Sequence, residues 1–121
     1  MTTVLVVDDD EQLRKLSNEV LTLEGFNVLL ASDGLEALSI IQSTRVDFLL
    51  TDFRMPNMDG MELIAELRGR GFLLPILLLS AYYNEHVQVP QDVYVLRKPI
   101  EPDRLVTAVS NLLSNSNSRY I

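Results

Sequence analysis

The chain has 121 residues, the usual size of one domain, and 47% of them are hydrophobic, which suffices for a single core and argues against general disorder. Its net charge of −7, with only 10 basic residues, argues against nucleic-acid binding through the phosphates. It has no cysteine, which excludes disulfides and thiolate metal sites. It begins without a secretory signal pattern and has no apolar run near the roughly 18 residues of a membrane helix, so we expect a soluble cytoplasmic protein without membrane contact.

Short apolar runs alternate with helical patterns along the chain. The runs have strand length and are apolar on both faces, as in strands that helices cover on both sides. We therefore predict strands at Thr3 to Val7, Asn27 to Ala31, Val46 to Thr51, Ile76 to Leu79 and Val93 to Leu96. Apolar residues at helical spacing follow the first, second, third and fifth of these strands.

Turn and cap residues mark the ends of these helices. Gly25 closes the first helical pattern, and the sequence SDG at Ser32 to Gly34 starts the second. The DG pair at Asp59 and Gly60 turns the chain into the third, which ends at Gly69 and Gly71. The last pattern runs to Leu113.

Two segments depart from this alternation. Ala81 to Asp92, AYYNEHVQVPQD, is polar and weakly periodic and contains Pro90, which predicts a short or irregular fourth helix. After Leu113 the sequence SNSNSRYI has the composition of a linker. We therefore predict one domain over residues 1–113 and a polar tail, or the start of a linker, over residues 114–121.

Five such βα units predict an α/β fold with a single doubly wound parallel five-stranded sheet in the flavodoxin-like order 2-1-3-4-5. In this order ligands bind beyond the carboxyl ends of strands 1 and 3. Asp8 and Asp9 follow the first strand and Asp52 follows the third. Ser80 follows the fourth strand and Lys98 the fifth, so we expect all five side chains at one edge of the sheet.

The three consecutive carboxylates Asp8 to Asp10 need a counter-charge, because like charges about 4 Å apart repel by roughly 4 kcal/mol at an effective dielectric constant near 20. Asp10 is expected to cap the first helix or to be solvated instead of binding a ligand. The other acids suit Mg²⁺, which prefers oxygen ligands. An aspartate can also attack phosphorus to form an acyl phosphate, with a hydroxyl, a lysine and a metal offsetting the charge on the phosphoryl oxygens.

Four sequence elements, each at a predicted strand end, resemble the receiver domain of bacterial response regulators, the CheY-like family. They are VVDDDEQ at Val6 to Gln12, TDFRMPNMDG at Thr51 to Gly60, LLLSA at Leu77 to Ala81 and RKP at Arg97 to Pro99. The resemblance covers nearly the whole chain. It implies a phosphoprotein of a two-component phosphorelay.

The resemblance also implies a role for each acid. Asp52 would accept a phosphoryl group from a sensor histidine kinase or a phosphotransfer protein. Asp8 and Asp9 would hold Mg²⁺ together with Asp52 and the backbone carbonyl of Arg54.

Ser80 would then bond a phosphoryl oxygen, and Lys98 would pair with it, the peptide bond from Lys98 to Pro99 being cis. The phosphorylated domain would act on a downstream protein or an output domain. It would not be an enzyme, although phosphotransfer and autodephosphorylation are intrinsic to it.

Two features depart from the family pattern. The family has an aromatic residue three positions before the lysine, where this chain has Val95, and Tyr94 would point to the other face of the strand. The stretch from Ser80 to Lys98 is about a helical turn shorter than is usual in the family. Both favour a first alternative, a receiver-like adaptor that binds partners without phosphorylation.

A second alternative is a small phosphohydrolase of the haloacid dehalogenase type. Asp8 would be its nucleophile and Asp10 its acid two residues on. The final acidic pair of that family is lacking, because only Glu101 and Asp103 follow the lysine, without a strand before them. The chain also lacks a cap that would enclose the substrate.

Overall fold

A computed structural model of the chain describes residues 1–81 and 89–118. The strands are β1 (Thr3–Val7), β2 (Asn27–Ala31), β3 (Phe48–Asp52), β4 (Ile76–Ser80) and β5 (Val93–Arg97). The helices in these residues are α1 (Glu11–Leu23), α2 (Gly34–Ser43), α3 (Gly60–Gly69) and α4 (Pro102–Ser118). None of these helices is both long and apolar enough to cross a membrane.

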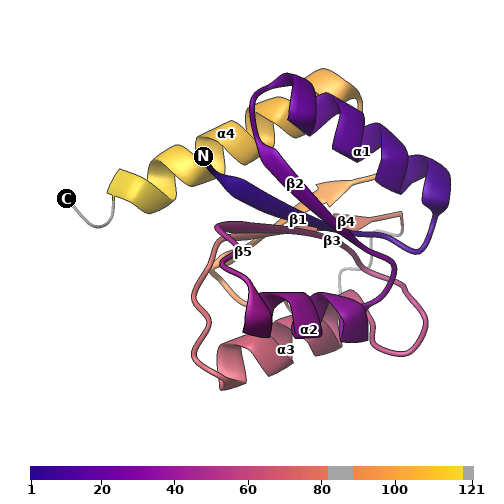
Figure 1. Ribbon diagram of the computed structural model, residues 1–121, viewed down its shortest axis with the longest axis vertical. Helices are drawn as coiled ribbons and strands as arrows, with labels where there is room; N and C mark the ends of the chain where they lie inside the picture. The colour runs from indigo at the N-terminus through magenta and orange to yellow at the C-terminus, as the bar shows by residue number, and fades with distance from the viewer. Residues whose placement is uncertain (82–88, 119–121) are drawn as a thin grey trace.

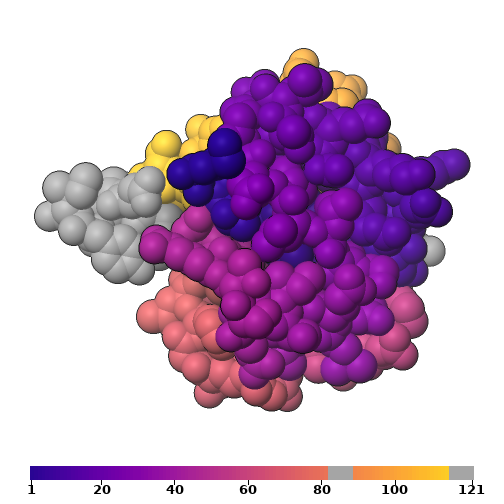
Figure 2. All heavy atoms as spheres, viewed as in Figure 1, coloured from indigo at the N-terminus to yellow at the C-terminus, as the bar shows by residue number. Residues whose placement is uncertain are grey.

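The five strands form one parallel sheet in the order β2-β1-β3-β4-β5, which confirms the predicted doubly wound fold (Figure 1). Helices α1 and α4 cover one face of the sheet, and α2 and α3 cover the other (Figure 1). The N-terminal half of the chain forms most of the surface in the view of Figure 2. Most of the predicted fourth helix, Ala81 to Asp92, falls on residues 82–88, which lie outside the described residues.

The core has two halves, one on each face of the sheet. In β1 the side chains of Val4 and Val6 pack with α1 and α4, while Leu5 and Val7 pack with α2 and α3. Phe48 at the start of β3 is fully buried on the α1 and α4 side. The apolar character of both strand faces, seen in the sequence, is therefore what lets one sheet bind two layers of helix.

The outer strand β5 departs from the prediction that helices cover every strand on both faces. Tyr94 is 42% exposed and Val95 is 48% exposed, so β5 is not covered along its whole length on either face. In the described part of the sheet β5 pairs with β4 alone and is an edge strand. Tyr94 lies beside Leu77 and Val95 beside Leu78, two residues of opposite core halves, which confirms that Tyr94 and Val95 point to opposite faces.

The helix ends follow the predicted cap residues. Asp10 accepts hydrogen bonds from the backbone N–H groups of Gln12 and Leu13 at the start of α1. Asp33 caps α2, and Asp59 forms a capping box with Glu62 at the start of α3. These caps matter for the site, because the loops that enter α1 and α3 carry its acidic residues.

Helix α4 extends to Ser118, beyond Leu113, where the predicted helical pattern ends. Its buried residues are Leu105, Val109 and Leu112, so the final turn continues the backbone hydrogen-bonding pattern after the apolar face has ended. The segment expected to be a polar tail is thus helical as far as Ser118. The domain boundary at residue 113 stays a prediction.

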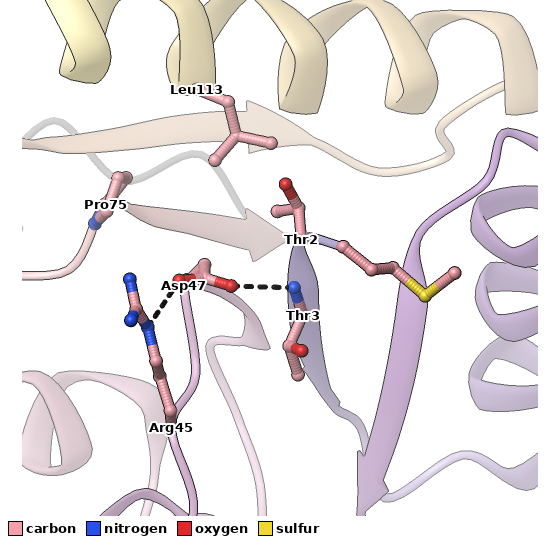
Figure 3. Close-up of a pocket in the computed structure, with 7 residues that line it drawn as sticks. Thr2, Thr3, Arg45, Asp47, Pro75 and Leu113 are labelled. Atoms are coloured by element: carbon pink, nitrogen blue, oxygen red, sulfur yellow. Dashed lines mark hydrogen bonds and ion pairs between the residues drawn. The ribbon is translucent and has the colours of Figure 1, made fainter.

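A single carboxylate joins two segments at the amino-terminal edge of the sheet. Asp47 Oδ2 accepts a hydrogen bond from the backbone N–H of Thr3 at 2.9 Å, and Asp47 Oδ1 lies 3.3 Å from Arg45 Nε (Figure 3). These residues line a cavity of about 500 Å³, to which Pro75 and Leu113 also contribute (Figure 3). Asp47 therefore ties the start of β1 to the start of β3.

We expect Asp47→Ala to lower the free energy of unfolding by about 1 kcal/mol, because the partly buried N–H of Thr3 would lose its acceptor. Arg45→Ala is the matched control, since the Arg45 side chain is 91% exposed and a surface ion pair contributes little. Urea denaturation of both variants measures the difference. Equal losses in the two variants would show that the Thr3 contact contributes nothing beyond the ion pair.

Candidate functional site

Three carboxylates meet where β1 and β3 end side by side. The last residue of β1 pairs with Thr51 in β3, so Asp8 and Asp52 follow on neighbouring strands. Asp8 and Asp52 are buried and Asp9 is exposed. One carboxylate oxygen from each of these three residues lies within 4.8 Å of the others. The structure therefore brings together the three acids that the sequence singled out.

These oxygens fit a small divalent cation. Mg²⁺ binds oxygens at about 2.0 to 2.1 Å, so ligand oxygens on opposite sides of the ion are about 4 Å apart, within the observed spread. Neither nitrogen nor sulfur ligands join this cluster in the described residues, which favours a hard cation such as Mg²⁺ over zinc.

Backbone contacts hold Asp8 in place. Its Oδ1 accepts a hydrogen bond from the N–H of Asp10 at 2.9 Å, and its own N–H donates to the carbonyl of Ala31 at 3.1 Å. Arg14 Nη1 donates to the carbonyl oxygen of Asp8 at 2.7 Å. No sequence pattern indicates this role of Arg14, which reaches back from the first turn of α1. Two of these contacts fix the backbone of Asp8, and the hydrogen bond from the Asp10 N–H holds its carboxylate.

Lys98 brings a positive charge to Asp8 and Asp52. Its Nζ lies 3.0 Å from Asp52 Oδ1 and 3.4 Å from Asp8 Oδ2. Its backbone N–H donates to the carbonyl of Ser80 at 2.8 Å, and its peptide bond to Pro99 is cis, as expected. Burial works to lower the pKa of Lys98, but the hydrogen bond to Asp52 and the charges of both acids outweigh it and raise that pKa. Lys98 is therefore held as an ammonium ion.

The remaining two site residues lie close by in the chain. Ser80 is the last residue of β4 and is buried, one position beyond Leu79, which pairs with Asp52. Arg54 is exposed in the loop between β3 and α3, two residues after Asp52. Both make contacts within the protein. The strand ends thus bring a hydroxyl to the same edge of the sheet as the acids.

One ammonium does not balance the charge of this cluster. Burial raises the pKa of Asp8 above its ordinary value, and the charge of Asp52 adds to the rise. The hydrogen bond from the Asp10 N–H and the attraction of Lys98 oppose this rise without cancelling it. A carboxylate in this position is stabilised by a further positive charge, which a bound divalent cation would supply.

Gly60 positions the end of β3 in a way that the sequence reading missed. Its N–H donates to the carbonyl of Phe53 at 2.8 Å. A Cβ at Gly60 would collide with the backbone oxygen of Asp52 and would lie 2.9 Å from Leu78 Cδ1. The DG pair was read only as a turn signal, although the absent side chain is what lets α3 begin against the backbone of Asp52.

An apolar groove opens beside the acids. It has a volume of about 570 Å³, and Asp8 and Lys98 form its polar end. The rest is mostly apolar and includes Leu13 and Leu16 of α1, which are 37% and 42% exposed. The other lining residues are Ser17, Leu79, Ala81, Pro99, Ile100, Pro102 and Leu105. A molecule that reached the acids from this side would therefore meet an apolar surface next to them.

Residues 4–110 match the family model described as the response regulator receiver domain. The chain belongs to this family. The match includes all four sequence elements that carry the resemblance, and it identifies the fold as that of a signalling domain. The acidic cluster lies at the edge where doubly wound sheets bind their ligands.

Known proteins agree with this assignment. Response regulator MprA of Mycobacterium tuberculosis is 49% identical over 78 residues, which cover 64% of this chain and 34% of that protein. Transcriptional regulatory protein GlrR of Escherichia coli K12 is 36% identical over 93% of this chain and 26% of its own length. The chain thus spans about a third or less of these relatives.

A solved structure shows the same fold. The receiver domain of the Francisella response regulator 1452 superposes with a TM-score of 0.88 at 28% sequence identity. The superposition covers 96% of this chain and 99% of that one. The described architecture is therefore that of a receiver domain along nearly its whole length.

We expect Asp8→Asn to increase the free energy of unfolding at pH 7 in metal-free buffer. A pKa raised in the folded state means that the charged carboxylate opposes folding above that pKa. This cost disappears as the pH falls through the raised pKa towards the ordinary value of 3.8. The difference in unfolding free energy between Asp8→Asn and the wild type should therefore shrink as the pH falls. Denaturant unfolding at several pH values measures the effect.

Asp10→Asn is the control, because it removes the same charge from an adjacent, exposed residue and asparagine also caps helices well. We expect little change in its stability. With Mg²⁺ at a hundred times its dissociation constant, the wild type should gain about 2.7 kcal/mol and Asp8→Asn clearly less. A variant Asp8→Asn that is less stable than the wild type in metal-free buffer would contradict the charge argument.

Proposed function

We propose that this domain is a phosphorylatable switch in which Asp52 accepts a phosphoryl group in the presence of Mg²⁺. The observation that carries the proposal is the cluster of Asp8, Asp9 and Asp52 with Lys98 Nζ 3.0 Å from Asp52 Oδ1. Membership of the receiver family supports it. Asp8, Asp9, Asp52 and the backbone carbonyl of Arg54 would hold the cation. Bound there, Mg²⁺ would offset the charge of the carboxylates and of the phosphoryl oxygens.

In the proposed reaction, a carboxylate oxygen of Asp52 attacks the phosphorus of a phosphohistidine on the donor. The new bond is the P–O bond of an acyl phosphate, and the bond that breaks is the P–N bond to the histidine. The imidazole nitrogen leaves with the electron pair of that bond. Burial of Asp52 at the end of β3 fixes the nucleophile, so positioning and charge supply most of the catalysis.

Two further side chains would act on the transferred group. Lys98 would move its contact from the Asp52 carboxylate to a phosphoryl oxygen, since the ammonium already lies within 3.4 Å of both buried acids. Ser80 would donate its hydroxyl to another phosphoryl oxygen from the end of the adjacent strand β4. Phosphorylation adds nearly two negative charges at this edge, which would change how the domain binds its partners.

The proposed donor is a sensor histidine kinase or a phosphotransfer protein, and the recipient of the signal is a downstream protein or an output domain. We also propose that the domain acts in the cytoplasm, where its kinase and its downstream partner would meet it. Val95, at the position where the family has an aromatic residue, favours a second candidate function, a receiver-like adaptor that needs no phosphorylation. The phosphohydrolase alternative loses support, because the chain belongs to the receiver family.

The first prediction from this proposal concerns Asp52. Incubation of the wild type with Mg²⁺ and acetyl phosphate is expected to add one phosphoryl group, stable in acid and labile in base, seen by intact mass. Asp52→Asn should abolish this addition, because the nucleophile is lost. Asp8→Asn should slow it at least tenfold, because the cation would lose a ligand.

Each other outcome separates the alternatives. A label that persists in Asp52→Asn and vanishes in Asp8→Asn would support the phosphohydrolase. A wild type that binds Mg²⁺ but takes neither the phosphoryl group nor beryllium fluoride would support the adaptor. Either result would overturn the proposed phosphoryl transfer to Asp52.

The apolar groove leads to a prediction about the donor. A protein donor must bring its histidine to the acids, and the groove beside Asp8 and Lys98 offers apolar contact on α1. We expect Leu16→Asp to slow transfer at least tenfold from a phosphorylated histidine phosphotransfer domain that labels the wild type. Labelling by acetyl phosphate, which is too small to need this surface, should remain unchanged. Equal slowing with both donors would place the defect in the acidic site instead of the groove.

A further inference from the structure

The loop between β3 and α3 is tied to the start of α2 by one side-chain pair. Asn57 Nδ2 donates a hydrogen bond to Asp33 Oδ2 at 2.8 Å. The other oxygen of the same carboxylate, Asp33 Oδ1, accepts from the N–H of Glu36 at 2.8 Å and so caps α2. One oxygen of Asp33 therefore caps α2, and the other binds the loop between β3 and α3.

The backbone conformation of Asn57 directs its side chain into this pair. Asn57 has a φ of 67°, and it is the one residue other than glycine with positive φ in residues 1–81 and 89–118. Asparagine tolerates this left-handed conformation better than most residues do. The loop thus keeps a conformation that is unfavourable for most side chains, and the contact with Asp33 helps to stabilise it.

A second contact beside the pair fixes the distance between the loop and α2. The N–H of Gly34 donates to the carbonyl of Met58 at 3.1 Å. A Cβ at Gly34 would lie 2.5 Å from that carbonyl oxygen, so a larger residue there would push the loop away. Met58 also packs against the core between the sheet and α2 and α3. The middle of the loop is therefore held by two hydrogen bonds to the start of α2 and by the packing of Met58 against the core.

The same loop carries two of the proposed cation ligands at its start. Asp52 ends β3, and the backbone carbonyl of Arg54 follows two residues later. Phe53 is anchored on both sides, since its N–H donates to Leu79 at 2.9 Å and its carbonyl accepts from Gly60 at 2.8 Å. Between Phe53 and Gly60, the hydrogen bond from Asn57 to Asp33 ties the middle of the loop to the start of α2.

We propose that Asp33 and Asn57 are positioning residues that hold the loop between β3 and α3 in the conformation that binds the cation. This inference rests on the proposed function, because it assumes that the acidic cluster binds Mg²⁺. The two residues touch neither the cation nor the phosphoryl group and act through the backbone of the loop. Loss of the pair would let the Arg54 carbonyl move and so weaken cation binding.

The charge state of Asp33 is suited to this role. The hydrogen bonds from the Glu36 N–H and from Asn57 lower the pKa of Asp33, so the carboxylate stays charged and remains an acceptor throughout the neutral range. The hydrogen bond between a charged carboxylate and an amide is stronger than one between two neutral groups.

An exchange of the two residues gives a sharp test. Asn57→Asp keeps the size of the side chain and its tolerance of positive φ but sets one carboxylate against another. We expect the Mg²⁺ dissociation constant of the full chain, measured by calorimetry, to rise about fivefold. Combining Asn57→Asp with Asp33→Asn restores a donor and an acceptor with an unchanged net charge, and asparagine still caps α2. The double variant should bind Mg²⁺ as the wild type does.

The direction of the change separates positioning from simple electrostatics. An added negative charge near a cation site would by itself tighten Mg²⁺ binding, whereas loss of the pair should weaken it. Asn57→Gly is a second variant, which accepts positive φ without strain and lacks the hydrogen bond, and it should also bind Mg²⁺ about fivefold more weakly. Tighter binding in Asn57→Asp, or failure of the double variant to recover, would overturn the inference.

Hydrogen exchange gives an independent readout. In the wild type, Mg²⁺ should slow the exchange of the Gly34 amide, which donates to Met58 in the loop, because coupling between two sites is reciprocal. The same cation should have a smaller effect on this amide in Asn57→Gly. Unchanged Mg²⁺ affinity in every variant would overturn the role of the pair and leave the proposed function intact. Absence of Mg²⁺ binding by the wild type would overturn both.

Discussion

The close approach of two buried carboxylates, Asp8 and Asp52, is the constraint on which the rest of the structure depends. A parallel sheet places the ends of β1 and β3 side by side, so acids after these strands must meet. Burial raises the pKa of Asp8 and the charge of Asp52 adds to the rise, so holding both carboxylates here costs stability. Lys98 offsets a part of this cost from the end of β5. The negative charge that Lys98 leaves unbalanced suits this edge of the sheet to a divalent cation.

Most of the surrounding structure keeps these acids from separating. Arg14 and the N–H of Asp10 hold Asp8 from the side of α1. Gly60 allows α3 to begin directly against the backbone of Asp52. If Asp8 and Asp52 moved apart to relieve their repulsion, the acidic cluster would be lost. Here the contacts are to backbone atoms of adjacent elements, so relaxation would require several hydrogen bonds to break together.

Periodicity predicted the strands, because it is a local pattern, and the usual order of five βα units then placed the strand-end acids at one edge of the sheet. The strand of Thr3–Val7 and the cap of Asp10 follow from residues next to them in the chain. The pair of Asp33 and Asn57 joins residues 24 positions apart and depends on a positive φ, which no local pattern marks. The exposure of β5 was missed for a similar reason, since VYVL is apolar whether or not a helix covers it.

Lys98 links the acidic cluster to the groove on α1. Its ammonium contacts Asp52, while the same side chain lines the groove with Leu13 and Leu16. A phosphoryl group on Asp52 would draw the ammonium towards itself, and the polar end of the groove would change with it. The position three residues before Lys98, by contrast, is occupied by Val95, which has no polar group that could bond to Ser80. A change at Asp52 could therefore reach the groove on α1 through Lys98, which contacts Asp52 and lines that groove. A route through an aromatic residue on β5 would need a side chain that Val95 does not provide.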